Sequence, residues 1–214
     1  DIKFLKSDFA GAIKEYDIAE KAGANDAVLF NNRGKSKMNT NDLVGAKSDF
    51  DKAILRDASY SRAFLNRGTA KFMLKDYSGA VDELEKVKSA EGETPEILTM
   101  LGVANYSNRK KEAARAYLDK ALNAGVKDSK ALLFAGYLRF EAKDYKGALE
   151  ALTAAERAGE KEDGLYLIRG KSYYQQKEYT AAIPDLEKGV HKGTADLAAY
   201  EAISLSYLAV QKEK

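Results

Sequence analysis

The sequence contains no cysteine, a single histidine and two prolines among its 214 residues. Without cysteine there are no disulfides, no thiolate nucleophile and no thiolate metal site. The one histidine, His191, leaves a metal to be held by oxygen ligands, and no calcium-loop spacing occurs. We therefore expect no metal and no cofactor, and we interpret His191 as a solvated side chain near a helix end.

A strong net charge and a long apolar run are also missing. The chain has 35 basic and 33 acidic side chains, for a net charge of +2, so no strong field recruits nucleic acid or an anionic membrane. No apolar stretch approaches the roughly 20 residues of a membrane span. We expect a protein or peptide partner, no nucleic acid and no direct membrane insertion. Asp1 falls inside the first helix of a repeat, so we expect any signal or lipidation sequence upstream and assign no localisation.

What the sequence does contain is a repeat with a period of 34 residues that no insertion or deletion breaks. One glycine and one alanine mark each unit, and we number unit positions so that the glycine is position 8 and the alanine position 20. The glycines are Gly34, Gly68, Gly102, Gly136 and Gly170, and the alanines are Ala12, Ala46, Ala80, Ala114, Ala148 and Ala182. This period, with two helical segments per unit, predicts a solenoid.

Each unit is expected to hold a helix A over roughly positions 1–14 and a helix B over roughly positions 17–30. An acidic residue precedes helix B in most units, as in Asp42 and Asp144, where a carboxylate caps free N–H groups. The recurrent glycine costs about 1 kcal/mol relative to alanine inside a helix. That cost is tolerated where two helix backbones approach closely, so the Gly and Ala positions mark the contact between helices A and B.

This pattern resembles the tetratricopeptide repeat, whose signature combines aromatic residues, a Leu-Gly pair and Ala-x3-Phe. Two features depart from that signature. Arg33, Arg67 and Arg169 replace the usual leucine before the glycine, and no proline closes a unit at position 32. The resemblance covers essentially the whole chain and implies an all-α, right-handed superhelical solenoid of antiparallel helix pairs.

The 34-residue register predicts one continuous solenoid domain. It starts with a partial repeat and ends with a terminal helix. The partial repeat comprises residues 1–26 and the terminal helix residues 197–214, and between them the full repeats are 27–60, 61–94, 95–128, 129–162 and 163–196.

No motif in the sequence predicts catalysis. Two stretches that begin at Gly34 and Gly170 read Gly-Lys-Ser, like the end of a phosphate-binding loop. The earlier glycine of that motif is replaced by Leu29 and Leu165, and both stretches lie in the middle of a helix. No nucleophile elbow is present either. We predict that the chain is not an enzyme.

The resemblance implies that the A helices line a concave groove and that positions 2, 5, 9, 12 and 13 face it. An apolar and aromatic strip edged by charges is typical of a protein interface. The predicted peptide-binding residues are Asn31, Lys35, Arg62, Leu65, Thr69, Phe72, Glu96, Val103, Tyr106, Lys130, Leu133, Tyr137, Phe140, Leu167, Lys171 and Tyr174. The alternative is that several of them close the contact between neighbouring A helices.

The predicted function is a non-catalytic scaffold that binds a peptide segment of a partner in this groove. The basic clamp with which some family members hold a chaperone's C-terminal carboxylate is disfavoured, since only Asn66 fits and Glu96 occupies a slot that needs a cation. Two alternatives are a targeting or regulatory arm of a larger enzyme and a homodimer formed through the C-terminal helix. That helix is apolar around much of its circumference, either because more chain follows or because another copy covers it.

Overall fold

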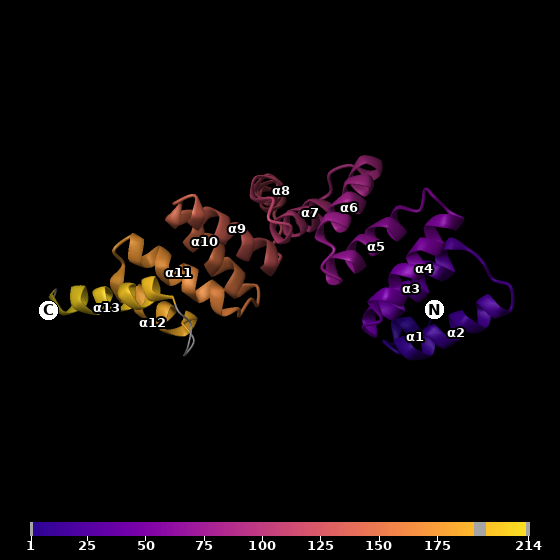
Figure 1. Cartoon of the computed structure of the whole chain (residues 1–214), viewed down its shortest axis with the longest axis horizontal. Helices are drawn as coiled ribbons and strands as arrows, with labels where there is room; N and C mark the ends of the chain where they lie inside the picture. Colours follow the sequence, from indigo (N-terminus) through magenta and orange to yellow (C-terminus); the bar gives the residue numbers. More distant parts are fainter. Residues whose placement is uncertain (1, 191–195, 213–214) are drawn as a thin grey trace. The chain divides into compact units, whose positions relative to one another are not determined.

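The computed structural model describes residues 2–190 and 196–212, and this part of the chain is α-helical without a β-strand (Figure 1). The helices are α1 (Ile2–Leu5), α2 (Phe9–Lys21), α3 (Ala27–Asn39), α4 (Leu43–Arg56), α5 (Ser61–Met73), α6 (Tyr77–Glu91), α7 (Pro95–Ser107), α8 (Lys111–Asn123), α9 (Ser129–Glu141), α10 (Tyr145–Arg157), α11 (Asp163–Gln175), α12 (Tyr179–Gly189) and α13 (Leu197–Lys212).

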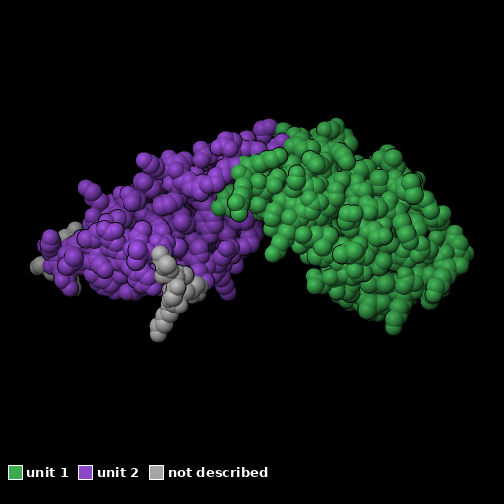
Figure 2. All heavy atoms as spheres, in the orientation of Figure 1, with its two compact units in different colours: residues 1–110 green, residues 111–214 purple. Residues whose placement is uncertain are grey.

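The helices form two compact units, residues 1–110 and 111–214, shown in different colours in Figure 2. In unit 1, each helix from α2 to α6 packs on the next one along the chain, up to α7. In unit 2, the same serial packing runs from α8 to α13. The predicted all-α architecture of stacked helix pairs is confirmed.

The corner between α9 and α10 is closed by hydrogen bonds on both sides. The N–H of Gly147 donates to the carboxylate of Asp144 at 2.9 Å, which caps α10. On the other side, the N–H of Lys143 donates to the Phe140 carbonyl and that of Asp144 to the Arg139 carbonyl, both at 2.9 Å. These two bonds end α9 in a Schellman motif.

The residue before the capping position has a left-handed backbone in every unit, although none of these residues is glycine. Their φ angles lie between 60° and 64°, and they are Ser7, Asn41, Lys75, Arg109, Lys143 and Lys177. The capping acid was expected from the sequence, whereas this backbone conformation was not. Only Asn41 belongs to a residue type that favours it, and four of the six are Lys or Arg.

The small residues lie at the contact between helices A and B, as expected. A Cβ atom on Gly34 would lie 2.6 Å from the ring of Phe50, and one on Gly170 would lie 2.7 Å from the backbone nitrogen of Leu186. Ala46 and Ala182, which come from the facing helices, are fully buried. In these two repeats the helices approach too closely for a side chain at position 8.

The arginines at position 7 form buried ion pairs, so they are more than departures from the family signature. Arg33 is 3% exposed and donates Nε and Nη2 to the two carboxylate oxygens of Asp49, at 2.9 and 2.7 Å. Arg169 and Asp185 repeat this arrangement at 2.5 and 2.9 Å. Arg67 donates to Glu83 at 2.8 Å. In each case the acid lies sixteen residues after the arginine, at position 23.

The other two full units change both members of this pair together. Leu101 stands at position 7 with Tyr117 at position 23, and Ala135 stands with Ala151. Both alanines are 3% exposed. Because the arginine and the acid are both replaced, no unpaired charge is buried at these positions.

Candidate functional site

A pocket in unit 1 brings five of the predicted groove residues together. It has a volume of about 390 Å³ and lies among α3, α5, the start of α7 and the C-terminal end of α6. The predicted residues that line it are Asn31, Lys35, Arg62, Leu65 and Glu96, and they are joined by Asn32, Tyr60, Ser61, Asn66 and Glu91.

Three asparagines form the polar base of this pocket. Asn66 donates Nδ2 to Oδ1 of Asn31 at 2.7 Å, and Asn31 donates Nδ2 to Oδ1 of Asn32 at 3.3 Å. Asn31 is only 2% exposed, so it supports the base and presents little surface of its own. Asn66, which is partly exposed, keeps its carbonyl oxygen and a second N–H beyond the bond to Asn31. From the sequence, Asn66 was expected only as a possible clamp residue, and its place in this pocket was not predicted.

Side chains of both charges surround the asparagines. Arg62, Glu91 and Glu96 are exposed at the pocket, and Lys35 is partly buried. The Lys35 ammonium lies 5.0 Å from the centre of the Phe4 ring, in a cation–π contact between α3 and α1. The pocket therefore offers hydrogen-bonding amides at its base and separate cations and anions at its rim.

The other predicted residues of unit 1 lie outside this pocket and are partly buried. They are Thr69, Phe72, Val103 and Tyr106. The Thr69 hydroxyl donates to the Leu65 carbonyl of its own helix at 3.0 Å. Phe72 packs edge-on against Tyr77, with 5.2 Å between ring centres.

This aromatic contact recurs at the corner between helices A and B. A ring at position 12 meets a ring at position 17 in Phe140–Tyr145 at 5.7 Å and in Tyr174–Tyr179 at 5.9 Å. The pairs join the two helices of one repeat. Part of the rings of Phe72, Phe140 and Tyr174 is thus used inside the fold, in contacts within one repeat.

In unit 2, one of the residues predicted to line the groove is fully buried. Leu133 is fully buried in a core cluster with Leu152 and Leu165, so its expected place in the groove is corrected. Tyr137 is partly buried against the same cluster, and its buried hydroxyl lies directly over Gly164. Phe140, Leu167 and Tyr174 are also partly buried.

The two predicted lysines of unit 2 are engaged by acids of the same unit. Lys130 contacts Glu162 at 2.9 Å and Glu160 at 3.2 Å. Burial alone would lower the pKa of Lys130, but the hydrogen bonds to these carboxylates outweigh it and raise the pKa. Lys171 binds Asp196 at 2.6 Å, and this bond lowers the pKa of Asp196.

Other kinds of site find no support in the part of the chain that the structure describes. Within residues 2–190 and 196–212 there is no group of three or more His, Cys, Asp or Glu residues arranged to hold a metal ion. His191 lies outside the described residues. Among the helices described, none is long and apolar enough to cross a membrane.

Comparisons with known proteins agree with the repeat. A family model described as "Tetratricopeptide repeat" matches residues 99–163 and 135–196. The search of curated proteins finds no match. The part of the chain that the family model matches spans α8 to α12 and most of α7.

Several solved structures share the fold at low sequence identity. One is PilF of Pseudomonas aeruginosa, with a TM-score of 0.75 and 17% identity over 99% of this chain and 93% of that one. Another is the C-terminal part of a repeat protein from Cytophaga hutchinsonii, with a TM-score of 0.70 and 18% identity over 100% and 88%.

A third is YrrB, whose structure is described as that of a TPR protein with an unusual peptide-binding site. It has a TM-score of 0.67 and 22% identity over 87% of this chain and 96% of that one. Proteins of this fold serve as protein-interaction scaffolds and are generally not catalytic. The 34-residue repeat and the paired helices give this chain the tetratricopeptide repeat fold, and its residues 99–196 match the family model.

Proposed function

We propose that the chain is a non-catalytic scaffold that binds an extended segment of a partner protein in the unit 1 pocket. The observation that supports this proposal is that five of the residues predicted to bind a peptide line one cavity with an asparagine base. An extended peptide has backbone N–H and C=O groups along its length, and a side-chain amide is matched to both. The amide of Asn66 is the group best placed for this role.

The charges at the rim give the proposed ligand its chemistry. Arg62 and Lys35 attract acidic side chains, while Glu91 and Glu96 discourage a segment that is acidic throughout. We propose a mildly acidic peptide whose acids lie toward Arg62 and Lys35. The partly buried aromatics of the A helices, among them Tyr106, would add apolar contact.

The test begins with selection of binding peptides from a random library on the full chain. The affinity of a selected peptide is then measured with wild type, Asn66→Ala and Arg62→Glu. We expect each variant to weaken binding about tenfold, which corresponds to about 1.4 kcal/mol. Lys14→Glu is the matched control, because Lys14 is exposed on α2 away from the pocket. If both pocket variants bound like wild type, the proposed site would be wrong.

A second candidate function is self-association through α13. Its exposed large apolar side chains are Leu197, Tyr200, Leu205, Tyr207 and Leu208. A helix with such a surface is typical of an interface. Sedimentation at rising concentration would give a growing mass for wild type and a constant monomer mass for Leu208→Glu. A monomer mass for both proteins would contradict this candidate.

A further inference from the structure

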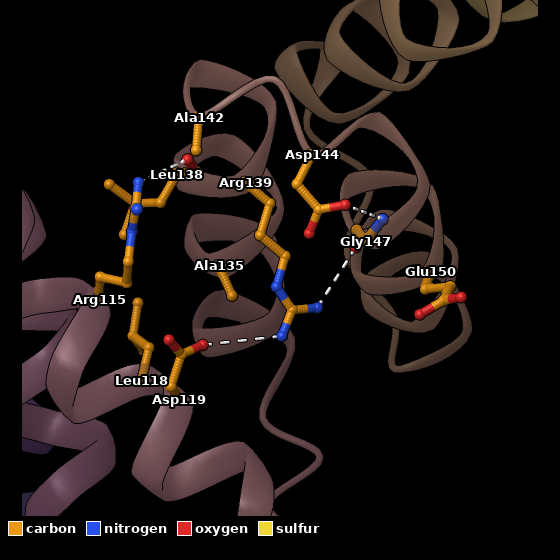
Figure 3. Close-up of a pocket in the computed structure, with 10 residues that line it drawn as sticks. All are labelled: Arg115, Leu118, Asp119, Ala135, Leu138, Arg139, Ala142, Asp144, Gly147 and Glu150. Atoms are coloured by element: carbon orange, nitrogen blue, oxygen red, sulfur yellow. Dashed lines mark hydrogen bonds and ion pairs between the residues drawn. The ribbon is translucent and has the colours of Figure 1, made fainter. Parts of the chain in front are cut away.

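Unit 2 contains a second cavity, of about 440 Å³, among α8, α9 and the start of α10. It opens beside Ala135, one of the two alanines that replace the buried arginine and acid pair of other repeats. Figure 3 shows Ala135 between Arg115 on one side and Arg139 on the other, with Asp119 below them on α8. This cavity shares no lining residue with the unit 1 pocket.

The chain itself provides three examples of what occupies the corresponding place. Arg33, Arg67 and Arg169 lie at position 7, where unit 2 has Ala135. Arg33 and Arg67 each donate Nη1 to an aspartate at position 25 of the preceding helix B, namely Asp17 at 2.8 Å and Asp51 at 2.7 Å. A guanidinium that enters between a helix A and the helix before it is therefore a recurrent arrangement in this protein.

Asp119 is the residue at position 25 before the cavity. Its side chain is 47% exposed, close to the 46% of Asp17 and the 44% of Asp51. It has lost the arginine that those two aspartates bind, and its ion pair with Arg139 is long, at 3.7 Å. Arg139 also donates to the Gly147 carbonyl at 3.3 Å, so it lies across the cavity with weak contacts at both ends (Figure 3).

The balance of charge around the cavity favours a cation. Three carboxylates, those of Asp119, Asp144 and Glu150, line it against the two guanidiniums of Arg115 and Arg139. Arg115 donates to the Leu138 carbonyl at 3.1 Å. Asp144 is already the cap of α10, which leaves Asp119 and the exposed Glu150 to meet a ligand.

From this geometry we propose that the cavity beside Ala135 is a binding site for an arginine side chain of a partner polypeptide. The incoming guanidinium takes the place of the missing position 7 arginine and pairs with Asp119. Arg139 must move aside, because it now holds the same carboxylate. The guanidinium that three other repeats supply from their own arginine thus comes from the partner polypeptide at this site.

The test is an NMR titration of the full chain with N-acetyl-arginine amide. We expect amide shifts centred on residues 115–119 and 135–147, with a dissociation constant on the order of millimolar for so small a ligand. The neutral isostere N-acetyl-citrulline amide should bind at least about tenfold more weakly. N-acetyl-glutamate amide serves as the ligand of opposite charge.

Three variants separate this proposal from its alternatives. Asp119→Asn should weaken arginine binding about tenfold or more, because it removes the charge that the guanidinium meets. Arg139→Gln should strengthen binding severalfold, since it removes the internal competitor. Ala135→Arg/Ala151→Asp should abolish binding by restoring the internal pair, and if that double variant failed to fold, Asp119→Asn would still decide.

Two results would overturn the proposal. The first is preferential binding of the glutamate derivative that is lost in Arg139→Gln, which would make the cavity a carboxylate site. The second is the absence of localised shifts with the arginine derivative, together with an unchanged spectrum of Arg139→Gln on addition of the ligand.

Discussion

Arg33 donates two parallel hydrogen bonds to Asp49 in the interior between α3 and α4. The Arg33 side chain is 4% exposed and the Asp49 side chain 2%. The same guanidinium reaches Asp17 and Glu20 on α2, so one side chain joins three helices. Lys37 adds a contact to Asp49 at 2.8 Å. A buried pair of this kind is costly to break on one side, because without Arg33 the Asp49 carboxylate stays in the interior with only the contact to Lys37.

Removal of only one member of the pair should be severe. We expect Arg33→Met to lower the free energy of unfolding by about 3–5 kcal/mol, whereas Arg33→Met/Asp49→Leu should recover most of the loss. Urea denaturation of wild type, both single variants and the double variant completes the cycle. Additive losses in the double variant would mean that the two side chains do not stabilise the fold as a pair.

The ion pairs also predict how stability depends on pH. Hydrogen bonds from Arg33 and Lys52 lower the pKa of Glu20 to about 2. Burial opposes ionisation of Glu83, but the bonds from Arg67 and Lys71 outweigh it and lower its pKa as well. Since these pKa values are lower in the folded state, the stabilisation is complete above about pH 4.5 and is lost as the pH falls toward about 2.

Urea midpoints measured from pH 7 to pH 2 check this expectation. Wild type should be insensitive near neutrality and should weaken steeply below about pH 4.5. Glu20→Gln should be less stable than wild type at pH 7 and should approach it at low pH. Glu201→Gln, exposed on α13 past its first turn, is the control for loss of a carboxylate. Equal pH profiles for wild type and Glu20→Gln would contradict the role given to Glu20.

The recurrent glycines should differ in their tolerance of alanine. In Gly170→Ala, the new Cβ would meet the backbone nitrogen of Leu186 at 2.7 Å, and we expect a loss of about 1–3 kcal/mol. In Gly68→Ala, the nearest atom is Cβ of Glu83 at 3.3 Å, and a gain in helix propensity of up to about 1 kcal/mol offsets the crowding. Gly170→Ala should therefore melt at a lower temperature than Gly68→Ala. Equal melting temperatures would argue against a closer contact between the two helices at Gly170 than at Gly68.

The left-handed corner residues predict a stabilising substitution. Lys143 has a φ of 63°, a conformation that costs a residue with a Cβ about 1–2 kcal/mol. Lys143→Gly removes that cost but adds flexibility to the unfolded chain, so we expect a net gain of about 0.5–1 kcal/mol. Lys146→Gly, within α10, should lose up to about 1 kcal/mol. A lower melting temperature for Lys143→Gly would contradict this account.

The architecture was readable from the sequence because its signals recur at a fixed spacing. A single glycine inside a helix has many explanations, but five glycines in register with an alanine on the facing helix have few. The caps were predictable for a similar reason, since an acid such as Asp144 stands before helix B in most units. Each of these local signals is weak alone, but together the copies at a 34-residue spacing predict the fold.

The candidate site was less predictable, because residues in one helical register differ in what surrounds them. Leu133 and Leu65 share position 5, yet Leu133 is enclosed in the core of unit 2 and Leu65 lines the unit 1 pocket. The buried arginine pairs were missed although a signal existed. Positions 7 and 23 change together through the repeats, from Arg33 with Asp49 to Ala135 with Ala151.

That joint change has an evolutionary consequence. In a solenoid each repeat touches only its neighbours, so a neutral exchange at two positions alters one layer and leaves the stability of distant layers untouched. Two substitutions in one repeat can therefore remove a buried salt bridge and leave in its place a cavity that is open to a ligand. New specificities would then arise layer by layer, without redesign of the scaffold that carries them.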